Sequence, residues 1–379
     1  MSKLINHLIK KIALFFDCVA ALFVFSNQKN GIVLIRLDGI GDFIIWLDSA
    51  KEYRQIYPNQ KIVLVANSSW SDLASNLPYW DEVWSVNLSY LRSNLLYRWA
   101  MLRKIRRANF EIAIQPTYSR ALLDGDSFIR ASNAMQRIGS VGDSTNISLH
   151  DKAIGDKWYT KLISANPALL MELLRNSEFI TNLAEINFNA CMPVLSPRIR
   201  LSGSLGIQRR YAILFPGASW QGRRWSVKSF AKVAEYLSQK YYLSIVLCGS
   251  DSDRVLCQEI GDLVISKCFN IAGKTTLLEL AEIIRNAELL IANETSAVHI
   301  AAAVSTPAIC ILGGGHYSRF LPYPDFIAGI KPSPVITKMD CYGCNWQCSM
   351  EYKGFGPVPC IKNIDVDAVL ELIDDMIKS

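Results

Sequence analysis

Apolar and polar residues alternate along the chain in two recurring patterns. Short apolar runs rich in β-branched residues, such as 31–37 and 61–67, predict strands buried in a parallel sheet. The first of these runs is followed by an amphipathic stretch at 43–58, which predicts a helix that ends at Pro58. The same patterns predict further elements in the first half: strands at 82–87 and 110–117, a loop at 137–146 and helices between residues 157 and 184.

The strand and helix pattern begins again in the second half of the chain. It predicts strands at 211–217, 243–250, 289–293 and 307–315, and helices at 225–241, at 277–287 and from Ser296 onward. Between the halves, residues 191–206 lose the periodicity and accumulate Pro, Ser and Gly, which predicts a linker. We therefore expect an α/β fold of two doubly wound domains, residues 1–200 and 201–379, with a ligand in the cleft between them.

Composition narrows the class of protein. Half of the 379 residues are hydrophobic and a fifth are charged, which supports two substantial cores and argues against disorder. The net charge of +6 is too small to indicate nucleic-acid binding. Six Lys and Arg residues without an acid lie within 92–107, and two interpretations stay open: the solvated face of a helix, or contact with anionic lipid headgroups or a phosphorylated acceptor. The ten cysteines suit a reducing compartment.

The N-terminus has a basic flank followed by an apolar stretch that Asp17 interrupts. The stretch is shorter than the roughly 20 residues of a membrane-spanning helix, and no signal-peptide cleavage site follows it. We predict an amphipathic or core-packing helix in a cytoplasmic protein. It either lies peripherally on the inner membrane or packs on its own domain.

Three motifs at strand ends carry candidate chemistry. In IRLDGIGD, Gly39 and Gly41 allow close backbone approach to a ligand, and Asp42 begins the next helix. A helix cap or dipole partner is the structural alternative for Asp42. In PGASWQGRRW, Ser219 and Arg223 suit a diphosphate, whereas the alternative is a surface turn with solvated arginines.

The third motif is ANETSAVHIAAA, in which polar residues cluster between an apolar strand and an Ala-rich helix. Ser296 is predicted to cap this helix, whose N-terminus then points at an anion. His299 lies three residues further along, on the same side as Ser296. Alone, this histidine would be interpreted as structural; within the cluster we favour a role in the site.

Together these motifs resemble glycosyltransferase family 9, the heptosyltransferase family of lipopolysaccharide assembly. The segments DKWYTKLI, NIAGKTTLLELAEIIRNAELL and LGGGHYSRFLPYP extend the resemblance over about residues 30–340. It implies a GT-B fold, in which two Rossmann-like domains face each other across a cleft. It also implies inverting transfer from a nucleotide sugar to lipopolysaccharide core or O-antigen, with no cofactor required for the chemistry. Residues 1–200 would bind the acceptor and residues 201–379 the donor, and the last helix would pack back on the N-terminal domain.

The resemblance also implies roles for single residues. Asp42 matches the family's catalytic aspartate, which takes the proton of the acceptor hydroxyl. Arg223 stands where the family usually has lysine, and a cation there neutralises the departing diphosphate. Glu294 stands where heptosyltransferases have an aspartate that helps hold the donor sugar, so the donor is not fixed as ADP-heptose. The remaining donor-binding candidates are Ser219, Thr295, Ser296, His299 and, from the rule for acids at the end of the second strand, Asp251 or Asp253.

A fourth motif lies at 341–360, where Cys341, Cys344, Cys348 and Cys360 follow the spacing C-x2-C-x3-C-x11-C. This spacing fits a tetrahedral sulfur site with a structural metal, for which zinc is the general expectation. A branch of the family that modifies autotransporter adhesins is similar in having a four-cysteine iron site. Disulfides and a metal-free loop are the alternatives.

Two other functions stay open, and a third is disfavoured. The adhesin branch implies a protein acceptor as one alternative. A catalytically degenerate nucleotide-sugar-binding module is another, suggested by the changes at Arg223 and Glu294. A nicotinamide oxidoreductase is disfavoured, because neither half has a complete G-x-G-x-x-G fingerprint.

Overall fold

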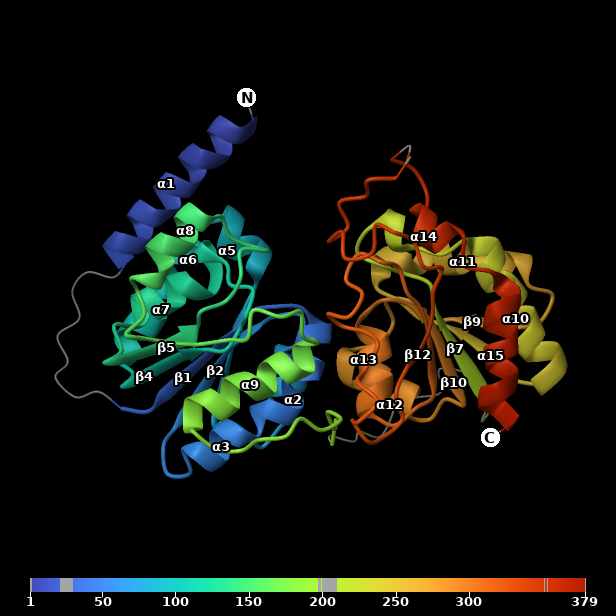
Figure 1. The fold of residues 1–379 in the computed structure, drawn as a ribbon, viewed down its shortest axis with the longest axis horizontal. Coiled ribbons are helices and arrows are strands. Elements are labelled where there is room, and N and C mark those ends of the chain that lie inside the picture. The colour runs from blue at the N-terminus through green and yellow to red at the C-terminus, as the bar shows by residue number, and fades with distance from the viewer. Residues whose placement is uncertain are drawn as a thin grey trace. The chain divides into compact units, whose positions relative to one another are not determined.

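The computed structural model describes residues 2–20, 30–196, 199, 210–350, 352 and 354–378. The chain divides into two compact units (Figure 1). Unit 1 comprises Met1–Ala168 and Leu173–Ala190, and unit 2 comprises Leu169–Glu172 and Cys191–Ser379. The division thus falls at the start of the predicted linker 191–206, of which residues 197, 198 and 200–206 lie outside the described residues.

Unit 1 is built on a six-stranded sheet in which every pairing is parallel. The strand order is β3 (Glu82–Val86), β2 (Ile62–Asn67), β1 (Ile32–Arg36), β4 (Ile112–Gln115), β5 (Gln136–Ser140) and β6 (Lys161–Ile163). This is the Rossmann order 3-2-1-4-5-6, in which ligands bind beyond the carboxyl ends of the strands where the order reverses. In unit 1 that switch point lies between β1 and β4.

Helices cover both faces of this sheet (Figure 1). One face carries α2 (Ile40–Ala50), α3 (Glu52–Ile56) and α9 (Glu172–Ala184), and the other carries α5 (Leu88–Ser93), α6 (Leu95–Ala108), α7 (Ser127–Ser132) and α8 (Leu149–Asp156). A short helix, α4 (Ser71–Ala74), and a π-helical turn, η1 (Leu122–Asp126), complete the unit. All five residues of β1 are buried because both faces are covered, which explains the continuous apolar run in the sequence.

The N-terminal helix α1 (Ser2–Ala20) packs against α6 and α7. Asp17, which interrupts its apolar stretch, is buried and accepts two hydrogen bonds from the Arg98 guanidinium, both 2.6 Å long. Arg98 belongs to the basic run 92–107, and Arg92 of the same run is paired with Asp124. The basic run is therefore not solvated throughout, because Arg98 is buried to anchor α1, whereas Arg92, Lys104 and Arg107 are exposed. Among the helices that the structure describes, none combines the length and apolar character needed to cross a bilayer.

We expect Asp17→Asn to destabilise unit 1 by about 3–5 kcal/mol, because it leaves the Arg98 cation buried without its partner. Urea unfolding followed by circular dichroism would measure this loss. Lys61→Gln is the matched control, since it breaks the exposed pair Lys61–Glu82 and should cost less than about 1 kcal/mol. Equal losses in the two variants would contradict the anchoring role of Asp17.

Unit 2 repeats the same architecture. Its parallel sheet has the order β12 (Ser333–Val335), β11 (Ala308–Ile311), β10 (Leu289–Asn293), β7 (Tyr211–Phe215), β8 (Ser244–Leu247) and β9 (Cys268–Asn270). Counted within the unit, this is again the Rossmann order, with its switch point between β7 and β10. The helices are α10 (Val227–Tyr241), α11 (Arg254–Leu263), α12 (Leu277–Arg285), α13 (Ser296–Ala303), α14 (Pro359–Lys362) and α15 (Val366–Lys378). The contacts of the last helix, α15, include α10 and β11 of its own unit.

Two predicted elements in unit 1 were wrong. The predicted loop at 137–146 contains β5, in which Gly139 is needed because a Cβ there would come within 2.3 Å of the Tyr159 ring. The predicted helical region 157–184 contains the strand β6 before α9 begins. β6 has only three residues, too few for an apolar period to be visible in the sequence.

Candidate functional site

Asp42 lies on the first turn of α2, directly after the switch-point strand β1. Gly39 is the N-cap residue of this helix and offers no side chain to cap it. A Cβ at Gly39 would come within 3.2 Å of Asp42 Oδ2, so the carboxylate lies back over the glycine turn. On the first turn of the helix, the carboxylate can act as a partner of the helix dipole. Because Asp42 is half-buried and not enclosed, its carboxylate can also reach a ligand as a base.

A buried cation that the sequence motifs did not indicate supports the same turn. Arg36, the last residue of β1, is 1% exposed and its Nε lies 2.9 Å from Asp38 Oδ2. Its NH1 donates to Asn176 Oδ1 over 2.9 Å, and its guanidinium stacks on the Trp46 ring. A charged residue inside an apolar strand is itself unusual, and that signal was present in IVLIRL.

In unit 2, the loops that follow β7 and β10 are joined by Asn293. Its Nδ2 donates to the Pro216 carbonyl over 2.7 Å, and its Oδ1 accepts from the Trp225 backbone N–H over 3.1 Å. Because β7 and β10 are neighbours at the switch point, this amide fixes the spacing of the two predicted motifs. The PGASWQGRRW and ANETS segments therefore form one site.

The centre of this site is the pair Arg223–Glu294. Arg223 NH2 donates to the Glu294 carbonyl over 2.7 Å and lies 3.4 Å from its Oε2. Burial raises the pKa of the Glu294 carboxyl to about 7, although the Arg223 guanidinium opposes the shift. Glu294 Oε2, Arg223 Nε and Thr295 Oγ1 are buried without a hydrogen bond to the described residues. Buried polar atoms that lack partners indicate a site for a polar ligand.

The other predicted donor residues of unit 2 lie in different environments. Ser219 is exposed on the loop after β7. The N-cap of α13 is Thr295, not Ser296 as predicted, since the helix begins at Ser296. Asp251 is exposed, whereas the carboxylate of Asp253 accepts from Ser250 in a capping box. Of these two acids, Asp251 has the more accessible carboxylate.

His299 is enclosed by aromatic side chains. It is 3% exposed, and its Nδ1 lies 3.1 Å from the Tyr323 hydroxyl. Burial lowers the pKa of its imidazole to about 4, so the ring is neutral at pH 7. The histidine whose side chain faces Glu294 is His316, with its Nδ1 3.9 Å from Glu294 Oε1.

The cysteine-rich loop packs against the Arg223–Glu294 site. The Trp346 ring lies under the Arg223 guanidinium at 4.8 Å, and Asn345 Oδ1 is bonded to His316 Nε2 at 2.9 Å. Gly315 has no room for a side chain, because a Cβ would come within 2.3 Å of the Trp346 ring. The loop that carries the cysteines thus forms one wall of the site.

The four thiols themselves form no disulfide within the described part of the chain. Burial raises the pKa of the Cys360 thiol, and the neighbouring Cys341, Cys344 and Cys348 raise it further. The Cys360 sulfur also accepts from the Gly314 N–H at 3.5 Å. Four sulfur donors are the chemistry that suits a thiophilic metal, but no three His, Cys, Asp or Glu side chains among the described residues gather closely enough to hold one.

Comparisons of the sequence with known proteins find one family and several named relatives. A model of glycosyltransferase family 9 (heptosyltransferase) matches residues 98–333. The chain is 25% identical over 302 residues to lipooligosaccharide heptosyltransferase 2 of Haemophilus influenzae, covering 74% of this chain and 83% of the relative. It is 24% identical over 299 residues to lipopolysaccharide heptosyltransferase 3 of Escherichia coli, covering 76% and 83%.

Solved structures show the same fold. ADP-heptose lps heptosyltransferase II of E. coli is similar with a TM-score of 0.65 at 17% identity, covering 93% of this chain and 99% of that one. The iron-containing dodecameric glycosyltransferase TibC of enterotoxigenic E. coli is similar with a TM-score of 0.53 at 12% identity, covering 93% and 77%. The family model spans more than half of the chain, and both units have the Rossmann strand order. This chain therefore belongs to glycosyltransferase family 9, has the GT-B fold and is a glycosyltransferase.

Proposed function

We propose that this enzyme is an inverting transferase that moves a heptose or related sugar from a nucleotide donor to lipopolysaccharide core or O-antigen. The observation that carries the donor half of this proposal is the pair formed by the buried Glu294 and the partly buried Arg223 at the switch point of unit 2. Beside it, Arg223 Nε and Thr295 Oγ1 lack a hydrogen bond to the described residues. Relatives of similar length named as heptosyltransferases support the sugar and the acceptor class.

In the proposed reaction, Asp42 takes the proton of an acceptor hydroxyl while that oxygen attacks the anomeric carbon of the donor. The bond between the anomeric carbon and the diphosphate oxygen breaks, and the nucleotide diphosphate leaves with the electron pair. Arg223 stabilises the negative charge that the diphosphate gains. Attack from the face opposite the leaving group inverts the configuration at the anomeric carbon.

Donor binding tests the proposal directly. We would measure the melting temperature with ADP-heptose, ADP-glucose, UDP-glucose and GDP-mannose, each at high concentration. A true donor at 100 times its dissociation constant should stabilise the chain by about 2.7 kcal/mol. ADP-heptose is the first candidate because the E. coli structural relative is named for it. If no nucleotide sugar raises the melting temperature, the proposed function is wrong.

A protein acceptor is the second candidate, because the four cysteines resemble those of the adhesin-modifying branch of the family. The similar glycosyltransferase TibC is iron-containing. The lipopolysaccharide acceptor remains the stronger proposal, since the TM-score is 0.65 for heptosyltransferase II and 0.53 for TibC. Heptose on a surface protein of producing cells, with unaltered lipopolysaccharide, would select the protein acceptor.

From their spacing we also propose that Cys341, Cys344, Cys348 and Cys360 hold a structural iron or zinc ion, which requires that the loop bring these thiols closer together than they lie here. Mass spectrometry of elements in the purified chain should then find about one metal ion per chain. Cys344→Ser should lose that metal, whereas Cys268→Ser, outside the motif, should retain it. Such a metal would not take part in the chemistry; it would hold the loop whose Trp346 lies under Arg223. A metal-free wild-type chain with normal donor binding would refute the metal site.

Peripheral attachment to the cytoplasmic face of the inner membrane is proposed for α1. Ile12, Phe15 and Val19 lie on one stripe of this helix and are 39%, 66% and 41% exposed, with the exposed Lys11 beside them. An exposed apolar stripe next to lysines suits an anionic lipid surface.

We expect Phe15→Asp to weaken binding to vesicles containing anionic lipid by about tenfold, because the aromatic ring can no longer insert. Co-sedimentation with vesicles would measure the effect. Phe326→Asp is the matched control, since Phe326 is 74% exposed on unit 2. If both variants lose binding equally, or if the wild-type chain does not bind, α1 is not the membrane contact.

A further inference from the structure

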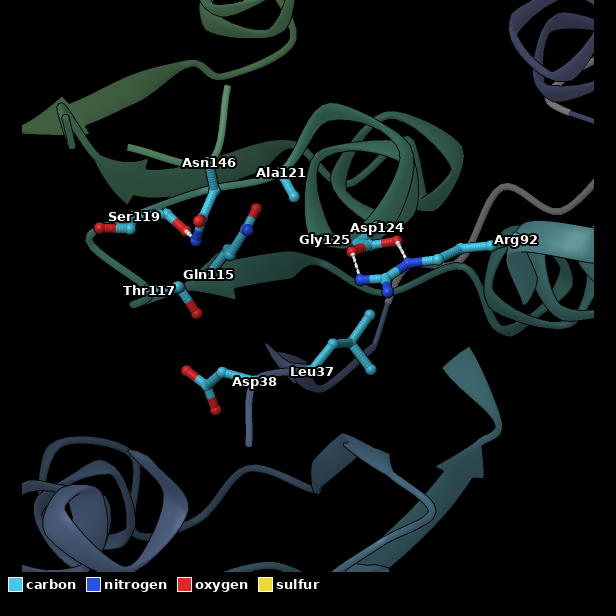
Figure 2. Close-up of a pocket in the computed structure, with 10 residues that line it drawn as sticks. All are labelled: Leu37, Asp38, Arg92, Gln115, Thr117, Ser119, Ala121, Asp124, Gly125 and Asn146. Carbon is cyan, nitrogen blue, oxygen red and sulfur yellow. Dashed lines mark hydrogen bonds and ion pairs between the residues drawn. The ribbon is translucent and has the colours of Figure 1, made fainter. Parts of the chain in front are cut away.

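Unit 1 contains a pocket of about 340 Å³, and of its lining residues only Leu37 and Asp38 belong to a sequence motif, IRLDGIGD (Figure 2). Leu37 and Asp38 follow β1 at its rim, and Gln115 ends β4, the strand paired with β1. The pocket therefore lies at the switch point of the first sheet, where Rossmann folds bind ligands. Its volume is near the lower end of the usual range for ligand pockets, about 300–1,000 Å³. A single sugar unit matches this size better than a whole nucleotide sugar.

Most of the residues that line this pocket have side chains that can form hydrogen bonds. Seven of its ten residues are polar, and they are Asp38, Arg92, Gln115, Thr117, Ser119, Asp124 and Asn146. Amides, hydroxyls and carboxylates supply the mixture of donors and acceptors that sugar hydroxyls need, because each hydroxyl both donates and accepts. In Figure 2, Asp38 and Thr117 lie on the side of the pocket away from the Arg92–Asp124 pair.

The charges in the wall are already paired. Arg92 donates to Asp124 twice, from Nε over 3.2 Å and from NH2 over 2.6 Å (Figure 2). Asp38 is paired with the buried Arg36. The two lining aspartates are thus balanced by Arg92 in the wall and by Arg36 behind it. A phosphate or acidic sugar would meet no uncommitted cation among the lining residues, because the lining arginine is paired with Asp124.

The floor of the pocket is held in place from beneath. The Tyr159 hydroxyl contacts Asp126 Oδ1 at 2.6 Å as well as the Gln115 amide, and these contacts fix the amide, including its nitrogen Nε2. Gly125 provides the space for that nitrogen, because a Cβ there would come within 2.2 Å of Gln115 Nε2. This preorganisation lowers the entropy lost when a ligand binds.

From the position, size and charge of this pocket we infer that it binds one uncharged, hydroxyl-rich sugar unit of the acceptor. The inference rests on the proposed function, since only a sugar transferase has such an acceptor. It makes Asp38, Gln115 and Thr117 the residues that select the acceptor. It also means that the enzyme prefers a neutral sugar at this point to a phosphorylated or acidic one.

Saturation-transfer NMR on the full chain without donor tests this preference. The neutral probes are the methyl α-glycosides of mannose, glucose and galactose, and the charged probe is mannose 6-phosphate. At least one neutral glycoside should bind, and mannose 6-phosphate should bind at least about tenfold more weakly than that glycoside. If no glycoside binds, or if mannose 6-phosphate binds as tightly, the inference is overturned.

Two variants locate the binding. Thr117→Val should weaken glycoside binding about 2- to 10-fold through one lost hydrogen bond. Asp124→Asn should shift the preference toward mannose 6-phosphate, because it removes one negative charge and releases Arg92. Asp72→Asn, which removes an exposed charge outside the pocket, should change neither preference nor affinity. Glycoside binding that is unaffected by Thr117→Val and Asp124→Asn would place the sugar elsewhere and overturn the inference.

The same protein preparation separates this inference from the proposed function. If a nucleotide sugar raises the melting temperature but no glycoside binds, the proposed function stands and the inference fails. If a glycoside binds but no nucleotide sugar stabilises the chain, the donor half of the proposed function fails, and with it the assignment of this sugar to an acceptor.

Discussion

Asp42→Asn is expected to lower kcat by about 10²- to 10⁴-fold, the usual contribution of a general base. The amide has nearly the same shape as the carboxylate, but it cannot accept the proton of the attacking hydroxyl. The position of Asp42 on the first turn of α2 also predicts a small structural effect, at most about 1 kcal/mol of lost helix-dipole stabilisation. Single-turnover assays with saturating donor, together with the melting temperature, would separate the two contributions.

Asp38→Asn is the matched control, because it makes the same chemical change four residues earlier in the same turn. We expect this variant to raise the KM for the acceptor more than it lowers kcat, since Asp38 lines the pocket of unit 1. If Asp42→Asn keeps nearly full kcat while Asp38→Asn loses it, the base is Asp38. Nearly full kcat in both variants would exclude both carboxylates as the general base.

The sequence predicted the strands that support the site much better than it predicted the edges of the sheets. The five-residue strands β1, β7 and β10 are covered on both faces, so continuous apolar runs marked them. The edge strands β6, β9 and β12 have three residues each and were missed. Too few positions are present there for a period to appear.

The site was predictable where motif residues stand at strand ends, and not where distant segments meet. Asp42, Arg223 and Glu294 follow the strands β1, β7 and β10, which topology brings to the switch points. Trp346 lies under Arg223 although more than a hundred residues separate them, and no local pattern in one sequence encodes that contact. The seven polar residues of the unit 1 pocket come from separate segments, for the same reason.

Arg223→Gln is expected to lower kcat by about 10²- to 10³-fold, because the charge gained by the departing diphosphate loses the cation that we propose stabilises it. Arg223→Lys should recover part of this loss, since it restores the charge without the planar fork of donors. Arg224→Gln is the matched control: Arg224 donates to the Ala218 carbonyl and to Asp253, not to Glu294. A similar loss of kcat in Arg224→Gln would mean that the loop, and not the Arg223 cation, is responsible.

The same variant should change how stability depends on pH. The pKa of the Glu294 carboxyl is already raised to about 7 by burial, so folding favours its protonated form. The stability that this group contributes is fully present below its ordinary pKa of 4.5 and is lost as the pH rises through 7. Without Arg223 nothing offsets the burial, so in Arg223→Gln the pKa should rise further and the loss should continue above pH 7. The gap in melting temperature between wild type and Arg223→Gln should therefore widen from pH 6 to pH 9. Arg223→Gln combined with Glu294→Gln should remove the widening, and a gap that stays constant with pH would show that the two side chains are not coupled.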